Sequence, residues 1–365
     1  MNNIVISGIN LVEGGTLSIF KDLLLFLNKS QISIDYNIIA LVHSKELFSD
    51  LDLQRNISFI EFKDSKRSYL KRCYYEYFYF KKFSKKLKPY LWLSLHDITP
   101  NVYTKKQAVY CHNASPFYNI KFRDIKLDKK IVFFSLFYKY LYKINIKKND
   151  YVIVQQNWLK KEFKKLYDIQ NVIVSSPIQK ESINTSEMHR EIEKNSFFYP
   201  SFPRVFKNFE VICEAVSILE NENIKNFKVY LTIDGTENAY SKEIVERYGN
   251  LDCIEFIGLL PREKVFDYYS RIQCLIFPST LETWGLPISE FKEYNKPIIL
   301  SDLPYAHETI GDYDKCLFFN STSPEHLKIQ MLKIINNKLE YTKNKKEVVE
   351  ELVANNWKEL FEILL

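Results

Sequence analysis

Short apolar runs recur along the chain, and longer segments with amphipathic spacing separate them. Short apolar runs are typical of strands that are buried on both faces, whereas amphipathic spacing is typical of helices. Strands that alternate with helices predict a parallel, doubly wound sheet. In the first half we expect a helix at Leu17–Asn28 and strands at Asn3–Ser7, Tyr36–Leu41, Ile57–Phe62, Leu91–Leu95, Ala108–Cys111 and Val152–Val154.

The second half repeats this alternation after a polar stretch at 176–195, whose few apolar residues are typical of a connection between domains. A chain of 365 residues is also long for one core. We therefore expect a first domain at 1–175, a hinge at 176–195 and a second domain at 196–345. Beyond the hinge the pattern predicts a strand from Phe197, helices at Phe209–Leu219, Arg262–Arg271 and Lys345–Leu365, and strands at Phe227–Ile233 and Cys253–Ile257.

The most informative stretch, 274–302, predicts a strand, a short loop, a helix and another strand. Cys274–Phe277 and Pro297–Leu300 are the apolar runs. Pro287 suits the first helical position, because its fixed φ fits a helix and its missing N–H would have no intrahelical partner there. This helix begins at the carboxyl end of a strand, which is where open α/β sheets bind ligands.

Groups suited to a nucleotide-sugar surround the start of that helix. Gly285 and Leu286 offer backbone N–H groups to an anion, and the helix dipole adds partial positive charge. Glu282 precedes the turn and Glu290 lies one turn into the helix, so two carboxylates flank the anion site. Carboxylates accept hydrogen bonds from sugar hydroxyls. A ligand with a central diphosphate and a sugar at each end would use all of these groups.

The string from Pro278 to Glu290 resembles the P-S-x-x-E-x-[FW]-G-L-P-x-x-E signature of the retaining glycosyltransferases with the GT-B fold. These are the family 4 or group 1 enzymes of bacterial polysaccharide, capsule and lipopolysaccharide biosynthesis. Phe291 stands where that family usually has Ala. Asn295 replaces a Gly, a mild change because Asn tolerates a left-handed turn. Both departures concern helix packing and the turn more than the proposed contacts.

The resemblance implies an α/β protein in which two Rossmann-like, doubly wound domains face a cleft. It also implies that the last helix, at about 346–365, returns to the first domain. In the family, the residue at Glu282 faces the donor sugar, the amides at Gly285 and Leu286 hold the diphosphate, and the residue at Glu290 holds the ribose hydroxyls. The turn at Leu259 lies near the nucleobase.

The resemblance implies further site residues in both halves. Gly14 and Gly15 open a helix, and the family's loop there lies near the diphosphate and the acceptor; the alternative is a plain strand–helix turn. His112 opens H-N-x-x-P-F, whose His points at the donor sugar; the alternative is a His satisfied by local backbone. Arg204 and Lys207 stand near the family's G-R-x-x-x-x-K-G, where Arg and Lys neutralise the leaving diphosphate.

Four details of the sequence leave questions open. Asn208 replaces the Gly of the family pattern, and Arg204 also suits a solvent-exposed position. His96 and Asp97, at another strand end, are interpreted as a satisfied core pair, with a second cleft contact as the alternative. His307 has no role that the sequence assigns.

The net charge of +6 is unevenly placed. The segment 63–88 has ten basic and two acidic residues, and 121–148 has nine and two, both interleaved with Tyr and Phe. One interpretation is two amphipathic helices with solvated lysines. The other is a patch that binds an anionic membrane surface. Nucleic acid is not expected, because no RNA- or DNA-binding motif accompanies the charge.

Composition limits the class of protein. Hydrophobic content of 46% with 26% charged residues is typical of a soluble globular protein, and no apolar run is long enough to span a bilayer. Six scattered cysteines and the absence of a basic leader at the N-terminus predict a cytoplasmic protein with reduced thiols, peripheral on the inner membrane face if the basic segments bind lipid. The sequence shows no His/Cys ligand cluster, so no metal or other cofactor is expected.

These observations predict a metal-independent hexosyltransferase. Its donor would be a nucleotide diphospho-sugar and its acceptor a hydroxyl of a saccharide or lipid-linked saccharide, with retention implied by the resemblance. Two alternatives stay open: a nucleotide-sugar epimerase on the same fold, and a non-catalytic protein that binds membrane or polysaccharide. Nucleotide release that requires an acceptor would exclude the epimerase.

Overall fold

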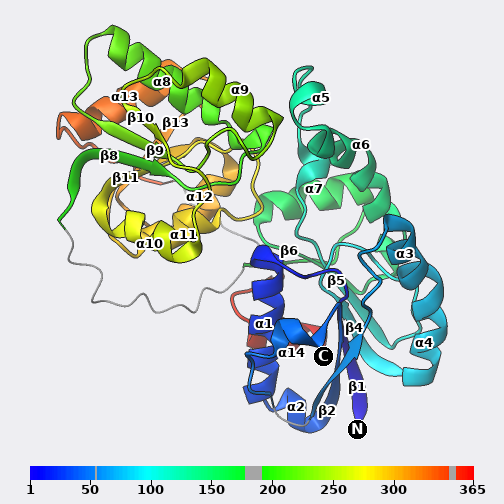
Figure 1. Ribbon diagram of the computed structural model, residues 1–365. Coiled ribbons are helices and arrows are strands. Elements are labelled where there is room, and N and C mark those ends of the chain that lie inside the picture. Colours follow the sequence, from blue (N-terminus) through cyan, green and yellow to red (C-terminus); the bar gives the residue numbers. More distant parts are fainter. Residues whose placement is uncertain (54–55, 177–190, 345–350) are drawn as a thin grey trace. The chain divides into compact units, whose positions relative to one another are not determined.

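The computed structural model describes residues 1–53, 56–176, 191–344 and 351–365 (Figure 1). The chain divides into two compact units. The first contains Met1–Asn113, Phe137–Ile178 and Val349–Leu365, and the second contains Ala114–Leu136 and Gln179–Val348. Most of the expected hinge, at 177–190, lies outside the described residues. Residues 114–136 belong to the second unit, whereas the sequence pattern assigns them to the first domain.

In the described part of the first unit, eight parallel strands form one sheet in the order β14-β7-β6-β5-β4-β1-β2-β3. The strands are β1 Asn2–Gly8, β2 Tyr36–Val42, β3 Ile57–Glu61, β4 Pro89–Ser94, β5 Lys106–Tyr110, β6 Tyr151–Val154, β7 Val172–Ser175 and β14 Val353–Ala354. Its helices include α1 Gly14–Lys29, α2 Ile32–Asp35, α3 Tyr69–Tyr74, the π-helical turn η2 Tyr75–Tyr79, α4 Phe80–Leu87, α7 Asn157–Tyr167 and α14 Trp357–Leu364.

Helices cover both faces of this sheet. Successive side chains of a strand point to opposite faces. Ile4 and Ile6 of β1 therefore join one core cluster with α1 and α14, and Val5 joins another with Phe80 of α4. The Trp357 indole N–H also donates to Asp22 Oδ2 at 2.7 Å, which ties α14 to α1. The C-terminal helix thus packs in the first unit.

Within the described residues, the second unit has six parallel strands in the order β10-β9-β8-β11-β12-β13. They are β8 Glu193–Tyr199, β9 Lys228–Leu231, β10 Ile254–Phe256, β11 Ile272–Phe277, β12 Ile298–Ser301 and β13 Cys316–Phe319. The helices include α5 Asp124–Leu127, α8 Phe209–Asn221, α9 Ala239–Tyr248, α10 Arg262–Arg271, α11 Leu286–Lys292, α12 Pro304–Ile310 and α13 Pro324–Ile335. Helix α6, Lys129–Lys143, contains residues of both units.

The strand order gives each sheet a point at which the chain changes direction across it. In the second unit, β9 and β10 follow β8 to one side, and the chain then returns to place β11, β12 and β13 on the other. In the first unit the corresponding point lies between β1 and β4. Open α/β sheets bind ligands at the carboxyl ends of the strands at such points. The two sheets confirm the predicted parallel, doubly wound architecture.

The C-terminal segment differs from the predicted helix at Lys345–Leu365. Residues 345–350 lie outside the described part, and Val353–Ala354 forms a strand that pairs with β7. The helix begins only at Trp357, because the Asn356 side chain accepts a hydrogen bond from the Glu359 N–H at 2.9 Å. Such a cap fixes the start of a helix. The predicted helix is therefore wrong at 351–356.

Candidate functional site

Lys207 and Glu282 form an ion pair at the switch point of the second sheet. Lys207 ends a 3₁₀ turn, Val205–Lys207, in the loop after β8, and Glu282 lies in the loop after β11. Their side chains are only 18% and 12% exposed, so little solvent screens the two charges. The pair therefore places one strong cation and one strong hydrogen-bond acceptor where an open α/β sheet binds its ligand.

Hydrogen bonds join the two loops that carry this pair. The Thr280 N–H donates to the Phe206 carbonyl at 2.7 Å, and the Ser279 hydroxyl donates to the same carbonyl at 3.2 Å. The Asn208 amide donates to the Pro278 carbonyl at 3.2 Å. These bonds fix the loop after β8 against the loop after β11, so the positions of Lys207 and Glu282 are set by the backbone.

Gly285 has a conformation that a side chain would disturb. Its φ of +86° lies in the left-handed region, and a Cβ there would stand 3.1 Å from Ile288 Cδ1 and 3.5 Å from Phe277 Cε1. The residue precedes Leu286, the first residue of α11, and Pro287 takes the second helical position. The turn therefore requires a glycine at position 285, because of both its φ and its close neighbours.

Glu290 lies one turn into α11 and has its own partners. Its Oε2 accepts from the Tyr269 hydroxyl at 3.2 Å, and its Oε1 lies 3.3 Å from Arg262 Nη2. Burial and the nearby Glu290 carboxylate raise the pKa of Tyr269 well above its usual value, so Tyr269 stays a donor. The Glu290 carboxylate is 14% exposed and is held in one orientation at the start of α11.

Arg204 pairs with Asp128 of the segment 114–136. Arg204 Nη1 lies 3.1 Å from Asp128 Oδ1, and the Asp128 side chain is only 5% exposed. The second oxygen, Oδ2, is buried and has no hydrogen-bond partner among the described residues. Arg204 is thus not a simple surface charge, because its partner is a buried carboxylate of the segment 114–136. Its partner was missed because Asp128 lies 76 positions away in the sequence.

Leu259 follows a glycine turn after β10 and is 49% exposed. In that turn Gly258 has φ +68°, and a Cβ there would lie 2.9 Å from Asp234 Oδ2. The close approach explains why glycine occupies the position. Leu259 is therefore a surface residue beside a turn in which the contact between Gly258 and Asp234 requires a glycine.

The glycine pair of the first unit lies at the start of α1. Gly14 is the first residue of the helix, with φ +70°, and no atom lies within 4 Å of its built Cβ. Both Gly14 and Gly15 are exposed. The first N–H groups of a helix have no intrahelical partners, so this end of α1 presents donors to solvent.

His112 follows β5 and is held on three sides. Its backbone N–H donates to Asp97 Oδ1 at 2.6 Å, its Nδ1 lies 3.3 Å from Gln155 Nε2, and its ring packs on Tyr110 with centroids 4.4 Å apart. Burial lowers the pKa of His112, which favours the neutral imidazole. Its Nε2 is buried and has no hydrogen-bond partner among the described residues. The Asp97 side chain, and not local backbone, therefore satisfies the main-chain N–H of His112.

His96 and Asp97 have different roles. His96 is 1% exposed, and its Nε2 lies 3.2 Å from Ser7 Oγ while its Nδ1 lies 3.1 Å from Arg72 Nη2. This matches the interpretation of His96 as a satisfied core residue. Asp97, in contrast, binds the backbone of the His112 loop. No signal near Asp97 in the sequence indicates that contact, because the two segments meet only through the pairing of β4 with β5.

His307, to which the sequence assigns no role, has partners within α12 and its surroundings. Its Nε2 lies 2.7 Å from Asp302 Oδ1, its Nδ1 lies 2.6 Å from Asn344 Oδ1, and its ring stacks on Phe318. The ring stacking holds α12 beside β13, and the two side-chain contacts join α12 to Asp302 and Asn344. We interpret His307 as a structural residue.

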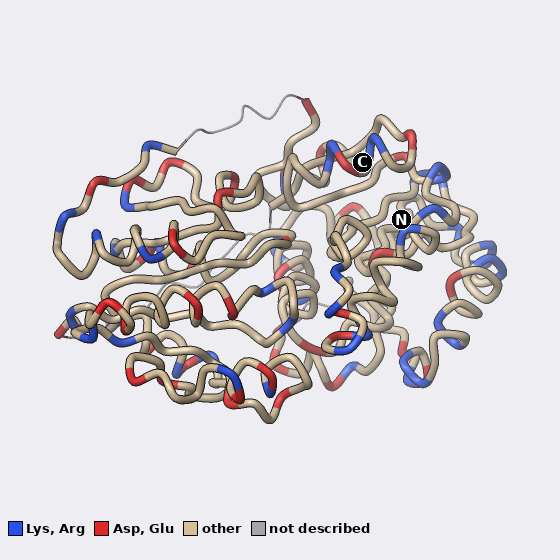
Figure 2. Tube along the Cα trace, turned by 90° about the horizontal axis from the view of Figure 1, so that it is seen from above, with Lys and Arg blue, Asp and Glu red and all other residues tan. Residues whose placement is uncertain are grey.

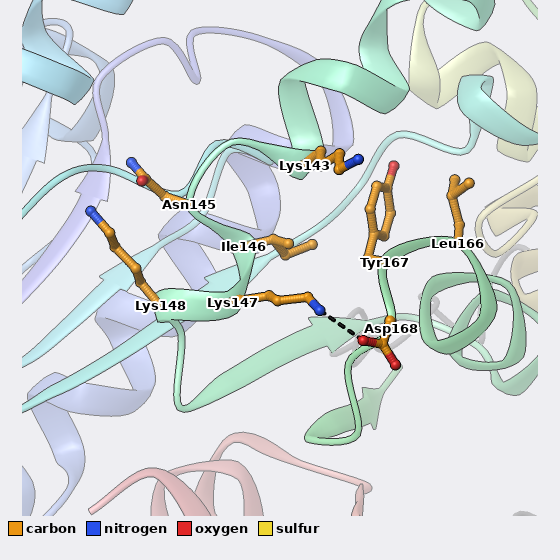
Figure 3. Close-up of a pocket in the computed structure, with 8 residues that line it drawn as sticks. All are labelled: Lys143, Asn145, Ile146, Lys147, Lys148, Leu166, Tyr167 and Asp168. Atoms are coloured by element: carbon orange, nitrogen blue, oxygen red, sulfur yellow. Dashed lines mark hydrogen bonds and ion pairs between the residues drawn. The ribbon is translucent and has the colours of Figure 1, made fainter.

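A hollow of about 460 Å³ in the first unit is distinct from these groups (Figure 3). Two of its lysines already have partners in the chain. Lys147 Nζ lies 2.8 Å from Asp168 Oδ2, and Lys148 Nζ donates to Asn101 Oδ1 at 3.2 Å. We assign no ligand to this hollow, which is lined by Lys143, Asn145, Ile146, Lys147, Lys148, Leu166, Tyr167 and Asp168.

A buried carboxyl group next to His96 predicts a pH-dependent stability. Glu76 is fully buried, its oxygens have no hydrogen-bond partner in the described structure, and burial raises its pKa from 4.5 to about 8. Between these values the folded chain keeps a proton that the unfolded chain has lost, so stability falls as pH rises, by about 1.4 kcal/mol per unit. Below pH 6.5 the lowered pKa of His96 opposes this trend.

We therefore expect the free energy of unfolding to fall by about 2 kcal/mol from pH 6.5 to pH 8 relative to a Glu76→Gln variant, which has no group to titrate there. Urea unfolding of both proteins at the two pH values measures this difference. Parallel curves for the two proteins would show that Glu76 is ionised in the folded state at pH 6.5.

The sequence of the second unit matches a known family. Residues 179–351 match the model of the family described as glycosyl transferases group 1. The chain is 24% identical over 212 residues to an O-antigen chain mannosyltransferase of Salmonella typhimurium, a match that covers 56% of this chain and 55% of that protein. It is 27% identical over 107 residues to O-antigen chain mannosyltransferase B of Escherichia coli, covering 29% and 28%. The chain thus spans about half, or less, of the curated relatives it matches.

Solved structures share the fold over nearly the whole chain. Sucrose-phosphate synthase from Thermosynechococcus elongatus has a TM-score of 0.64 at 13% identity, over 92% of this chain and 90% of that one. The lipopolysaccharide outer core galactosyltransferase WaaB has 0.60 at 12%, over 94% and 92%. Anabaena HepE in complex with UDP-glucose has 0.59 at 11%, over 93% and 91%. Residues 179–351 thus match the group 1 glycosyltransferases, and the chain shares its fold, the two-domain GT-B fold, with these solved structures.

Proposed function

We propose that the protein transfers a hexose-type sugar from a nucleotide diphospho-sugar to a hydroxyl of a saccharide or lipid-linked saccharide, with retention of anomeric configuration and without a metal ion. The observation that carries this proposal is the Lys207–Glu282 pair at the switch point between β8 and β11. The family match and a structural neighbour solved with UDP-glucose support the same class of donor.

Each group of the second unit has a task in this reaction. Departure of the nucleoside diphosphate leaves negative charge on an oxygen, and a fixed cation lowers the energy of that charge. Lys207 supplies the cation, with Arg204 as a second one when Asp128 releases it. Glu282 accepts hydrogen bonds from the sugar once Lys207 turns to the phosphate. The Gly285 and Leu286 amides bind the diphosphate, Glu290 the ribose hydroxyls, and Leu259 packs near the base.

The first unit carries the other groups of this proposal. The amides of Gly14 and Gly15 contribute donors near the diphosphate and the acceptor, and the His112 ring binds an oxygen of the donor. The relatives named as O-antigen mannosyltransferases support an acceptor of envelope polysaccharide chemistry. A cytoplasmic location, where nucleotide-sugars are made, belongs to the same proposal.

A panel of UDP-, GDP- and dTDP-sugars tests the donor class. A ligand that binds only the folded state raises the melting temperature, so a thermal-shift screen identifies the donor as the sugar nucleotide with the largest shift. This donor is then incubated with lipid-linked saccharide acceptors. Nucleotide release that depends on the acceptor supports the transferase, and a product with the donor's anomeric configuration supports retention. Conversion of the donor sugar without an acceptor would instead show an epimerase.

Side-chain cations in place of a metal predict insensitivity to chelation. Because Lys207 and the backbone amides supply the positive charge, we expect turnover in excess EDTA to stay within about twofold of turnover with Mg²⁺. The assay uses protein dialysed against chelator, with a parallel sample in Mn²⁺. A loss of tenfold or more that Mg²⁺ or Mn²⁺ restores would contradict metal independence.

The segment 63–88 carries the features of a membrane-binding surface, and we propose that it binds anionic lipid. Its helices α3, η2 and α4 leave Tyr69, Leu70, Tyr74 and Phe78 67%, 83%, 49% and 68% exposed. Exposed lysines follow along the same helices, which lie at the right-hand edge of Figures 1 and 2 and carry blue segments in the second. Apolar side chains inserted at the headgroup level beside lysines match an anionic bilayer.

The segment 121–148 is similar, with Phe122 92% exposed. None of the helices in the described part of the chain combines the length and hydrophobicity of a membrane-spanning segment.

Vesicle sedimentation tests this surface. We expect the protein to bind vesicles that contain phosphatidylglycerol and not pure phosphatidylcholine, and a Leu70→Ser/Phe78→Ser variant to bind at least about tenfold less tightly. Substitution at exposed sites leaves stability nearly unchanged. A control variant with Leu166→Ser, at an exposed leucine outside both segments, should bind like the wild type. Equal binding by all three proteins would exclude the 63–88 surface.

A further inference from the structure

Asp97 holds the loop that carries His112 from an adjacent strand. Its Oδ1 accepts from the backbone N–H groups of His112 and Asn113 at 2.6 and 3.2 Å. Two tyrosine hydroxyls also donate to this carboxylate: Tyr142 to Oδ1 at 2.8 Å and Tyr138 to Oδ2 at 2.9 Å. Asp97 itself has φ +72°, an unfavourable value for a residue with a side chain. Such strain persists only when the surroundings fix the residue, and these four bonds do so.

Gln155, at the carboxyl end of β6, contacts the ring of the same His112. Its Nε2 lies 3.3 Å from His112 Nδ1. The orientation of the amide follows from Tyr110, whose hydroxyl donates to the Ser175 carbonyl at 2.6 Å. The Tyr110 oxygen must then accept its hydrogen bond from Gln155, a bond that opposes the rise in the pKa of Tyr110. The amide NH₂ group of Gln155 therefore faces both Tyr110 and His112.

This orientation determines where His112 carries its proton. An NH₂ group only donates, so Nδ1 of the neutral ring accepts, and the hydrogen resides on Nε2. That Nε2 is buried and has no hydrogen-bond partner in the described parts of the chain. A buried donor without a partner destabilises the fold unless a ligand or water binds it. The strand-end loops thus present one oriented N–H group for which the described residues offer no acceptor.

We propose that Asp97 and Gln155 are positioning residues that present His112 as a neutral Nε2–H donor to an oxygen of the bound nucleotide-sugar. The inference rests on the proposed function, since the donor supplies the oxygen. Asp97 fixes the backbone of the loop, and Gln155 fixes the ring and its tautomer. Neither residue contacts the donor, so both act through His112.

Nuclear magnetic resonance of the ¹⁵N-labelled full chain tests the tautomer without any activity. Long-range ¹H–¹⁵N correlations of the imidazole rings, with His112→Gln to assign the signal, should show the proton on Nε2. Gln155→Glu replaces the donating amide by an accepting carboxylate of the same shape, and Nδ1 should become protonated. Gln155→Met, which offers no hydrogen bond, should give a mixture of tautomers. A wild-type signal protonated on Nδ1, or no change in either variant, would overturn the proposal.

Kinetics then link the tautomer to transfer. Gln155→Glu should lower kcat about 10- to 100-fold with KM for the donor changed less than about threefold, because the lost contact strengthens as charge develops. Gln170→Glu, at an exposed position of the same unit, adds the same charge and should leave kcat unchanged. An unchanged kcat in Gln155→Glu with Nδ1 protonated would overturn the positioning role.

Ligand titrations separate the two kinds of oxygen. If the His112 signal shifts with the nucleotide-sugar and not with the nucleoside diphosphate, the oxygen belongs to the sugar; a shift with both identifies the phosphate. If the wild type shows the Nε2–H tautomer but neither ligand moves its signal, the donor contact is overturned. A wild type that binds donor and shifts the signal yet transfers no sugar would instead refute the proposed transfer activity.

Discussion

Replacing Lys207 by methionine is expected to lower kcat about 100- to 1,000-fold, the usual effect of removing one group that stabilises developing negative charge. The methionine keeps the apolar stem of the lysine and removes only the cation. The loss should fall on kcat more than on KM for the donor, because charge on the leaving diphosphate is greatest in the transition state. Steady-state kinetics with the donor from the thermal-shift screen measure both quantities.

Two controls accompany this variant. Lys225→Met removes a lysine whose exposed ion pair with Asp252 lies outside the switch point, and it should leave kcat unchanged. Lys207→Met also leaves Glu282 without its cation, so its melting temperature is compared with that of Lys207→Met/Glu282→Gln, which removes the unpaired charge. If Lys207→Met keeps kcat within about fivefold of the wild type while folding normally, Lys207 does not stabilise the leaving group.

Replacing Glu290 by alanine is expected to raise the Kd for the nucleoside diphosphate about 10- to 100-fold. Hydrogen bonds to a charged group contribute about 1.5–3 kcal/mol, and 1.4 kcal/mol is a factor of ten in affinity. Tyr269 holds the carboxylate in place, so the ribose hydroxyls meet an acceptor that is already oriented. Isothermal titration calorimetry with UDP and GDP measures the change directly, without an acceptor.

Glu293→Ala is the matched control, since Glu293 is an exposed carboxylate directly after the same helix. It should leave Kd unchanged. A second comparison uses Tyr269→Phe, which keeps the carboxylate but removes its hydroxyl partner, and a smaller loss of affinity is expected. If Glu290→Ala binds the nucleoside diphosphate as tightly as the wild type, the ribose contact is absent and Glu290 serves only the packing of α10 against α11.

Local sequence was sufficient to predict the elements of the second unit. The bounds of α10 agree with the predicted helix, Arg262–Arg271, and the strand–loop–helix–strand order of 274–302 is the one observed. The two departures from the family pattern also have the expected effects. Phe291 is buried and packs against Tyr269 and Tyr294, and Asn295 adopts a left-handed φ of +56°. The helices, the strands and the turn at Asn295 depend on neighbours a few residues away, whereas Tyr269 lies 22 positions from Phe291.

Contacts between distant segments could not be read from the sequence. The bond from His112 to Asp97 and the pair of Arg204 with Asp128 depend on strand order and loop placement, which local patterns do not encode. The strands β7 and β13 are not among the predicted ones, although β6, β9 and β12, which are predicted, have the same length of four residues. The segment 114–136 was placed in the first domain on chain order alone, whereas the Arg123–Glu210 ion pair, at 2.5 Å, fixes it in the second unit.

Asn208 shows what a residue gains by standing where related sequences use glycine. It adopts the left-handed φ of +57° that the turn requires, and its amide also donates to the carbonyls of Pro278 and Ser321. A glycine would make the turn with less strain but would leave both carbonyls to water. The loops after β8, β11 and β13 would then lose the hydrogen bonds that join them. Asn208 thus adds strain to one turn, but it links three strand ends and should keep them together as the temperature rises.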